Sequence, residues 1–243
     1  QHTDFDEDFL HSTYYTNDVI QNEKFYDEDG KVIKELTYDN SQLSKTTLYE
    51  YDGVGNEIKR SIYAPSVEEA EYYEEIISTY ENNLLEFEDV IKYNSGEVTG
   101  GQTFDYEYDS NGNLIKMTNY YKSNDFTSIT TYEYDEHNHC TLECLEASNS
   151  DGSAVSFSYR YYQYTYNADG TYDKQCFCTC SSLEDVEKLK NGQYGNMLCP
   201  TQILTYEGKR VLGYQYFNSP TDASVTNFYV DEYSHATFGI PNT

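Results

Sequence analysis

The sequence contains no tryptophan, only four prolines, and no apolar run long enough to cross a membrane as a helix. With 14 glycines in 243 residues, it is neither a collagen nor a proline-rich linker. Bases are also scarce: 15 Lys and Arg face 43 Asp and Glu, a formal net charge of −28. Such a surface repels nucleic-acid phosphates, so we expect no nucleic-acid partner and no transmembrane segment. The acids either keep the protein soluble and its strand edges apart, or attract cationic partners.

Catalytic signatures are missing as well. No GxSxG, HExxH or P-loop sequence occurs, and no acid–base pair stands out among the 43 carboxylates. The short acidic turns lack the spaced ligands of a calcium loop, and turn chemistry explains them. We therefore expect a protein without a cofactor, and we favour a binding module over an enzyme.

Tyrosine is unusually abundant, with 29 copies against 11 Phe. It favours strands and buries an apolar ring while its hydroxyl stays hydrated. Many of these tyrosines belong to a repeat. Three segments align without a gap, each with Asp after the first Tyr, Ile seven residues after it and Lys eight after it: Tyr26–Lys34, Tyr51–Lys59 and Tyr108–Lys116. A degenerate copy, Tyr166–Lys174, lacks the Ile, and shorter copies of the turn begin at Tyr38, Tyr80, Tyr93, Tyr134 and Tyr206.

The repeat has a direct structural interpretation. Asp, Asn and Gly at its centre favour tight turns, and the flanking residues alternate with period two. Successive turn tyrosines often lie 12 or 13 residues apart, as from Tyr26 to Tyr38 and from Tyr38 to Tyr51. Each interval holds one strand and one reversal. We therefore predict an all-β fold of repeated antiparallel β-hairpins, a meander that is extended or curled.

The Tyr-Asp-x-x-Gly-Asn unit, followed by an aliphatic residue and a base, resembles the YD repeat of RHS-type bacterial surface proteins. The resemblance covers most of Tyr26–Tyr216, with irregular repeats in a chain far shorter than an RHS shell. It implies an extracytoplasmic array of hairpins that serves as a shell or as a surface for carbohydrate or protein. It carries over no catalytic residue, and no autoprotease or toxin segment is visible.

Two segments interrupt the repeat. Ala64–Glu75 is expected to form a long loop or a short helix. Ser181–Gly192 is expected to form a helix, with a capping box of Ser181 and Glu184, an apolar face of Leu183, Val186 and Leu189, and a stop at Asn191-Gly192. We expect an acidic tether or first strand over residues 1–20 and a single repeated-hairpin domain over 21–243. The chain begins at Gln1 with a polar segment, which suggests a removed signal segment and a protein that is secreted or lipid-anchored at the bacterial cell surface.

Tyrosines that share a strand face are the first candidates for binding. If that face is open to solvent, it would contact carbohydrate or protein at the cell surface. If it is not, the rings bury one another. The candidates are Tyr49, Tyr51, Tyr106, Tyr108, Tyr132, Tyr134, Tyr162, Tyr164 and Tyr166.

Cysteine and histidine cluster in the second half and suggest an alternative function, a hydrolase or metal-dependent protein with a site near residues 137–180. Three interpretations stay open: buried thiols, disulfides that join Cys140 or Cys144 to a strand neighbour and Cys199 to another, or a metal site. Catalysis by His139 with Cys140 or Cys178 has no further support in the sequence. The candidate metal ligands are His137, His139, Cys140, Cys176, Cys178 and Cys180.

Overall fold

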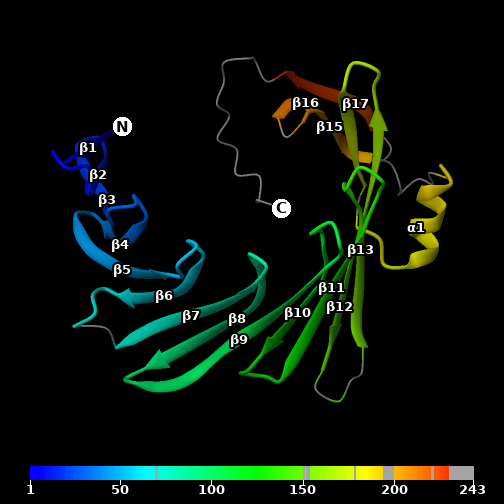
Figure 1. Ribbon diagram of the computed structural model, residues 1–243. Helices are drawn as coiled ribbons and strands as arrows, with labels where there is room; N and C mark the ends of the chain where they lie inside the picture. The colour runs from blue at the N-terminus through cyan, green and yellow to red at the C-terminus, as the bar shows by residue number, and fades with distance from the viewer. Residues whose placement is uncertain are drawn as a thin grey trace. The chain divides into compact units, whose positions relative to one another are not determined.

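The computed structural model describes residues 1–243 except 69–70, 150, 152–153, 178, 194–199, 209, 220–221 and 230–243. These residues form antiparallel strands and one short helix (Figure 1). The elements are β1 (His2–Phe5), β2 (His11–Thr16), β3 (Val19–Tyr26), β4 (Val32–Asp39), β5 (Gln42–Tyr51), β6 (Glu57–Ala64), β7 (Tyr72–Glu81), β8 (Leu84–Asn94), β9 (Glu97–Tyr108), β10 (Leu114–Tyr121), β11 (Phe126–Tyr134), β12 (Cys140–Ser148), β13 (Ala154–Tyr166), β14 (Thr171–Phe177), α1 (Leu183–Lys190), β15 (Pro200–Glu207), β16 (Arg210–Ser219) and β17 (Asp222–Tyr229).

The chain divides into two compact units. Unit 1 comprises residues 1–128 and 149–152 and contains β1 to β10, each paired antiparallel with the next strand in sequence. Unit 2 comprises residues 129–148 and 153–243, where β12 to β17 pair in the same way. The predicted all-β meander of hairpins is therefore confirmed. The single domain expected over 21–243 stays a prediction.

The five-residue turns that follow the repeat tyrosine share one hydrogen-bond pattern. Between β5 and β6, Asp52 N–H donates to the Asn56 carbonyl at 2.9 Å, and Gly55 N–H donates to the Asp52 carbonyl at 3.2 Å. Asp52 Oδ1 accepts backbone N–H groups of residues 54, 55 and 56, and its Oδ2 accepts the Asn56 amide at 2.9 Å. The fourth residue, Gly55, has φ +103°, which glycine adopts without strain. The same two backbone bonds close the turns that begin at Asp27, Asp109, Asp135 and Asn167.

The isoleucine of the repeat has a role that the sequence did not reveal. Ile33, Ile58 and Ile115 are each passed over in the cross-strand register, because the pairing shifts by one residue at that point. Each is therefore the extra residue of a β-bulge beside an Asp turn. The degenerate copy, which lacks the isoleucine, pairs from Tyr162–Cys176 to Tyr166–Tyr172 without a shift. In these four copies of the repeat, the β-bulge is present where the isoleucine is present and absent where it is missing.

Several repeat tyrosines tie one hairpin to the preceding one. The Tyr51 hydroxyl donates to the Val32 carbonyl at 2.8 Å, and Tyr80 donates to the Glu57 carbonyl at 3.1 Å. In both cases the acceptor is the first residue of the preceding strand. Each bond satisfies a backbone carbonyl beside a turn, at a point where the ladder ends. These hydroxyls therefore have a structural use in the repeat.

Helix α1 confirms one predicted element and corrects two of its details. The capping residue is Ser182, not Ser181: its Oγ accepts Asp185 N–H at 3.2 Å and donates to Asp185 Oδ2 at 2.8 Å. Both serines fit the sequence pattern, and the observed cap lies one residue later than predicted. Leu183, expected on the apolar face, is 56 % exposed, whereas Val186 and Leu189 are fully buried. The predicted stop at Asn191-Gly192 is confirmed, since Asn191 is the C-cap and Gly192 has φ +67°.

The buried core of the described residues lies under this helix. Val186 and Leu189 pack with side chains of β12 to β14 and the segment that follows: Leu142, Tyr159, Tyr161, Phe177 and Cys180. In unit 1, by contrast, Val90 is the one apolar side chain among the described residues that is buried to this degree. Ion pairs across neighbouring strands, such as Lys59–Glu75 at 2.7 Å, contribute to that sheet. Unit 1 is thus a thin sheet of paired side chains.

One further expectation about a segment is corrected. The loop expected over Ala64–Glu75 is shorter, because β6 includes Ala64 and β7 begins at Tyr72. The acidic opening, expected as a tether or first strand, contains β1, which pairs with β2. Among the described residues, no helix is both long and apolar enough to span a membrane.

Candidate binding site

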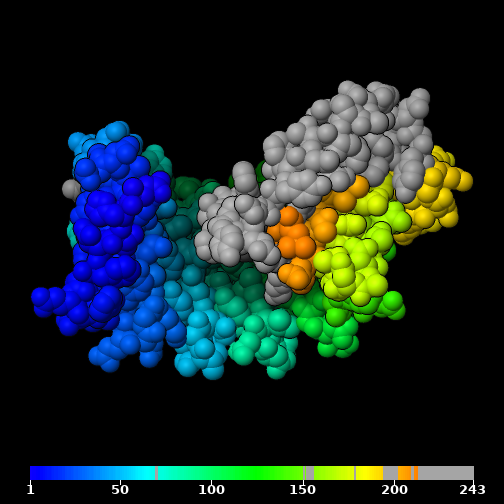
Figure 2. Space-filling model, turned by 90° about the horizontal axis from the view of Figure 1, so that it is seen from above, coloured from blue at the N-terminus to red at the C-terminus, as the bar shows by residue number. Residues whose placement is uncertain are grey.

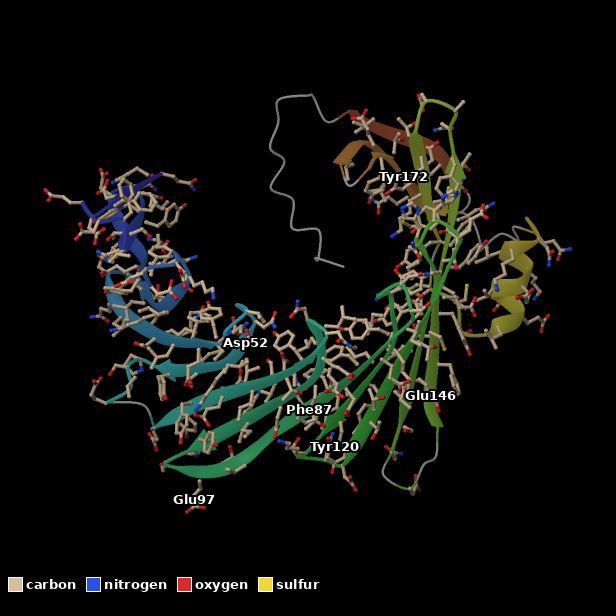
Figure 3. All side chains as sticks on the ribbon, viewed as in Figure 1. Asp52, Phe87, Glu97, Tyr120, Glu146 and Tyr172 are labelled. Atoms are coloured by element: carbon tan, nitrogen blue, oxygen red, sulfur yellow. The ribbon has the colours of Figure 1, made fainter. Side chains whose placement is uncertain are left out.

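Five aromatic side chains of unit 2 form a continuous row across four strands or their turns. We call it the aromatic row: His139, Tyr164, Tyr166, Tyr172 and Tyr206. The His139 ring stacks on Tyr164, with centroids 5.0 Å apart, and lies 4.5 Å from Tyr172. Tyr172 stacks on Tyr206 at 5.0 Å and an interplanar angle of 9°. Figure 3 labels Tyr172, the second residue of β14.

Cross-strand register places these rings on one face. Tyr166 pairs directly with Tyr172, and Tyr172 pairs with Tyr206 on the next strand. Directly opposed residues of an antiparallel pair point to the same side of the sheet. The same register places Lys174 opposite Tyr164, and its Nζ lies 4.1 Å from the centroid of the Tyr162 ring. This cation–π contact brings a positive charge to the margin of the row.

A hydrogen-bond chain fixes one end of the row. His139 Nδ1 lies 2.7 Å from the Tyr166 hydroxyl, which donates to Asp135 Oδ2 at 2.5 Å. The hydroxyl has a single proton, which it uses in the hydrogen bond to Asp135. Neutral His139 therefore carries its own proton on Nδ1 and donates it to the Tyr166 oxygen. This arrangement leaves His139 Nε2 as an acceptor.

The turn that holds this chain is a modified copy of the repeat turn. Asp135 Oδ1 accepts backbone N–H groups of His137 and His139 at 2.9 Å each, as the Asp109 carboxylate accepts those of its own turn. In the Asp109 turn, Oδ2 is occupied by the Asn113 amide. His139 replaces that asparagine in the Asp135 turn, so Oδ2 accepts Tyr166 instead. One substitution in the repeat thus builds this end of the row.

Burial and hydrogen bonding set the ionisation of these groups. Burial raises the pKa of Tyr164, and burial together with the hydrogen bond to Asp135 raises that of Tyr166. Burial also lowers the pKa of His139, although the Asp135 charge opposes it. Burial raises the pKa of Asp135, but the bonds from Tyr166 and the backbone N–H groups outweigh it and lower the pKa. At neutral pH the row is therefore neutral and its Asp135 anchor is charged.

The stacking decides which part of each ring meets solvent. Stacked rings cover part of one another's faces, as His139 does with Tyr164 and Tyr172 does with Tyr206. Tyr172 is instead tilted by 43° against Tyr166 and by 52° against Tyr164. Tyr166 is 41 % exposed, while Tyr164 and Tyr172 are half-buried. Tyr172 donates its hydroxyl to the Gly208 carbonyl at 3.0 Å, and Tyr164 donates to the Cys140 carbonyl at 2.9 Å. The row is therefore a strip of partly stacked rings with hydrogen-bonded hydroxyls rather than a flat platform of ring faces.

The other side of the same strands carries helix α1. Tyr159 and Tyr161 of β13 belong to the core with Val186 and Leu189, whereas Tyr162, Tyr164 and Tyr166 alternate with them along the strand. Figure 2 shows α1 in yellow, with side chains open to solvent on its far side from the core. One face of unit 2 is thus covered by the helix, and the row lies on the opposite face.

The remaining predicted tyrosines lie in other settings. Tyr49 donates to Glu35 Oε2 at 3.1 Å, and burial with the Glu35 charge raises its pKa to about 12. Tyr106 and Tyr108 line a shallow hollow of unit 1 together with Glu81, Glu86, Glu107 and Asp109. Tyr132 and Tyr134 are half-buried on β11. Of the nine predicted tyrosines, Tyr164 and Tyr166 enter the row.

Sequence reasoning missed two features of the aromatic surfaces. Tyr172 is the second residue of β14 and Tyr206 the second-last of β15, and only the cross-strand register shows that they are opposed and stack. In unit 1, Tyr63, Tyr73 and Tyr93 form a ladder across β6, β7 and β8, with centroids 5.4 Å and 4.3 Å apart. Period-two alternation along each strand marks a face, but it does not say which residues of distant strands are opposed.

The alternative Cys/His site is dispersed in the part of the chain that can be described. No group of three or more His, Cys, Asp or Glu side chains among those residues is arranged to hold a metal ion. His137 and His139 instead contact the Tyr166 ring, at centroid distances of 4.1 Å and 5.7 Å. Cys178 and Cys199 lie outside the described residues, so the metal and disulfide alternatives that involve them stay predictions.

The described thiols also lack the activation that a nucleophilic cysteine needs. Cys140 and Cys144 are free thiols. Burial raises the pKa of Cys140 to about 11, and it raises that of Cys144 and Cys176 too. The reactive form is the thiolate, which a raised pKa disfavours at neutral pH. Burial thus works against these three cysteines as nucleophiles.

No known protein family and no curated protein matches this sequence. Among solved structures, the crystal structure of TcdB2-TccC3-Cdc42 is similar over 85 % of this chain and 14 % of its own, at 11 % identity and a TM-score of 0.24. The crystal structure of a porin-like protein from Bacteroides vulgatus is similar over 90 % and 92 %, at 11 % identity and a TM-score of 0.27. This chain thus spans only a small part of the TcdB2-TccC3 chain. TM-scores this low do not establish a shared fold.

Proposed function

We propose that this protein is a non-catalytic, extracytoplasmic binding or scaffold module that attaches to another protein through the aromatic row. One observation carries the proposal: a strip of partly stacked tyrosine and histidine rings lies on the face opposite helix α1. Tyrosines with hydrogen-bonded hydroxyls give contact area at a small loss of side-chain entropy on binding. A sugar ring needs an exposed aromatic face to stack on, and the stacked pairs of the row cover part of those faces. A protein surface therefore suits the row better than carbohydrate does.

Cross-linking with intact cells of the organism that makes the protein tests this proposal. The purified chain is labelled and cross-linked, and the contacts are mapped by mass spectrometry. Tyr172→Ala and Tyr166→Ala are expected to abolish the cross-links to a protein partner, because they remove the middle of the row. Tyr72→Ala is the matched control, since it removes an exposed tyrosine of unit 1. Circular dichroism confirms that each variant is folded.

Three results would contradict the proposal in different ways. Cross-links that persist in both row variants would place binding elsewhere. Row-dependent binding on a glycan array would assign carbohydrate as the ligand instead. Turnover of a glycoside or ester substrate that depends on His139 would show that the protein is a hydrolase.

A further inference from the structure

The lysine that ends the repeat has a recurrent setting in the three complete copies. There it stands opposite the residue just before the repeat tyrosine. Lys59 forms an ion pair with Glu75 at 2.7 Å. Lys116 forms one with Glu107 at 2.6 Å. Lys34 instead lies over the ring opposite it, with its Nζ 5.3 Å from the centroid. In two of the three complete copies the lysine is thus neutralised by a carboxylate of a neighbouring strand.

The missing β-bulge gives Lys174 of the degenerate copy a different position. A bulge shifts the register by one residue, and such a shift moves the side chains that follow to the other face of the sheet. The lysines of the complete copies follow a bulge and therefore lie on the face opposite the repeat tyrosine. The degenerate copy pairs without a shift, which places Lys174 directly opposite Tyr164 and on the same face as Tyr166. Without the bulge, the lysine of the repeat lies among the tyrosines of the aromatic row.

On this face Lys174 has uncharged neighbours. Burial raises the pKa of the Cys176 thiol, and the opposing effect of the Lys174 charge is smaller, so the thiol is protonated at neutral pH. Lys174 is half-buried, and no ion pair within the described part of the chain involves it. The residues directly opposite it and two positions away on its own strand are Tyr164, Leu204, Tyr172 and Cys176.

The ring contacts of Lys174 satisfy its charge only in part. Its Nζ lies 4.1 Å from the centroid of the Tyr162 ring and 5.9 Å from that of Tyr164. Ring faces attract the positive charge, but an ammonium group also has three N–H donors, which prefer oxygen acceptors. A charge that is half-removed from water is costly unless an opposite charge compensates it. A negative group on a binding partner would supply that compensation.

The other charges near the row limit what this negative group can be. Arg160, on the same face, is already paired with Glu143 at 3.1 Å. Asp135 places a negative charge at one end of the row. Nucleic acids and sulfated glycans need several cations, and the net charge of −28 repels them. One carboxylate of a protein, by contrast, matches the one unpaired Lys174, and apolar residues beside it match the tyrosine rings.

We propose that Lys174 is the specificity-determining residue of the aromatic row, and that it binds one Asp or Glu carboxylate flanked by apolar side chains on a partner protein. This inference rests on the proposed function and names the chemistry of its partner. The carboxylate accepts hydrogen bonds from Lys174 Nζ, while the flanking side chains cover Tyr164 and Tyr172. Pairing of the half-buried ammonium with a single acid then selects among the proteins that could contact the rings.

A phage-displayed library of random peptides, panned on the full chain, tests this inference. We expect the enriched peptides to share one Asp or Glu among apolar residues, and fluorescence anisotropy measures their affinity as synthetic peptides. Lys174→Met keeps an unbranched apolar side chain without the charge and should weaken binding at least about tenfold, whereas Lys174→Arg should retain most of it. Lys45→Met is the matched control, since it removes an exposed lysine of unit 1. Circular dichroism confirms that each variant is folded.

A second measurement separates the ion pair from other effects of the substitution. Changing the acid of the peptide to its amide should weaken binding to the wild type by the same factor, and it should have no further effect on Lys174→Met. Such coupling is expected only if the two groups contact each other.

Several outcomes would overturn the inference. Panning that enriches no peptide, or peptides without an acid, would do so, as would equal affinity of the wild type and Lys174→Met. Binding of heparin or a DNA oligonucleotide that depends on Lys174, without such peptides, would make a polyanion the ligand. Peptides that lose affinity for Tyr172→Ala but not for Lys174→Met would leave the row as a binding surface and overturn the carboxylate alone. Peptides insensitive to both variants would count against the row as well.

Discussion

The two residues of the Tyr-Asp dipeptide have different structural roles. The tyrosine hydroxyl satisfies a carbonyl of the preceding strand, as Tyr51 does at Val32. The aspartate gathers the N–H groups of its own turn, as Asp52 does (Figure 3). Neither task involves a ligand. Most of the repeat is therefore explained by the needs of the hairpin, and function has to be sought where a copy departs from it, as at His139.

The turn aspartates should make stability depend on pH. Burial alone would raise the pKa of Asp52, but hydrogen bonds from Asn56 and the turn backbone lower it. In Asp109 the Asn113 bonds are the main cause of the same lowering. A carboxyl whose pKa is lower in the folded state contributes stability above its unfolded pKa, about 3.9, and loses it as pH falls through the folded pKa. Asp52→Asn plus Asp109→Asn should therefore reduce the free energy of unfolding at neutral pH, but not at strongly acid pH.

Urea unfolding followed by circular dichroism over a pH series measures this difference. Glu28→Gln is the control, because it removes an exposed charge from the Asp27 turn. A difference between the double variant and the wild type that stays constant down to strongly acid pH would show that the charge of the aspartates has no part in it.

At the scale of the elements, strand β9 depends on one glycine. Gly101 has φ +135°, and a Cβ there would meet the Val90 carbonyl oxygen at 1.9 Å, a backbone atom that cannot turn aside. We expect Gly101→Ala to destabilise unit 1 by about 3 kcal/mol or more, because backbone strain and a steric clash act together. The neighbouring Gly100 gives the matched comparison. Its Cβ would lie 3.8 Å from Ser123 Cβ, so Gly100→Ala should change the free energy of unfolding by less than about 1 kcal/mol. Equal effects in thermal unfolding would show that β9 yields at this point.

The same scale shows what the sequence can and cannot predict. Turn residues act on their own backbone, so Tyr-Asp-x-x-Gly predicts each hairpin locally, and α1 is predicted by its charges and stop. Its cap is displaced by one residue, because Ser181 and Ser182 both fit the pattern. The aromatic row could not be predicted in full. Tyr172 and Tyr206 are paired across β14 and β15, and α1 with its flanking segments lies between these two strands in the sequence.

For the whole molecule, the dominant electrostatic fact is the formal net charge of −28. Salt bridges such as Lys59–Glu75 stabilise the sheet locally, but the 15 bases are too few to offset 43 acids. Self-repulsion of the remaining carboxylates therefore works against the compact state. Burial raises the pKa of Glu88, which makes its ionisation a further cost of folding at neutral pH. A group whose folded pKa is raised contributes stability below its unfolded pKa and loses it as pH rises through the folded pKa.

These charges predict that salt stabilises the protein at neutral pH. The Debye length falls from about 30 Å at 0.01 M to about 10 Å at 0.1 M, so added salt screens the many repulsions more than it weakens the few ion pairs. We expect the melting temperature to rise by several degrees over that range of sodium chloride. As pH falls, Glu88 with its raised pKa takes up a proton before the turn aspartates with their lowered pKa values, the negative charge decreases, and the same salt series should have a smaller effect. A melting temperature that falls with salt at neutral pH would mean that the ion pairs outweigh the repulsion, and that the thin sheet of unit 1 is held chiefly by its cross-strand charges.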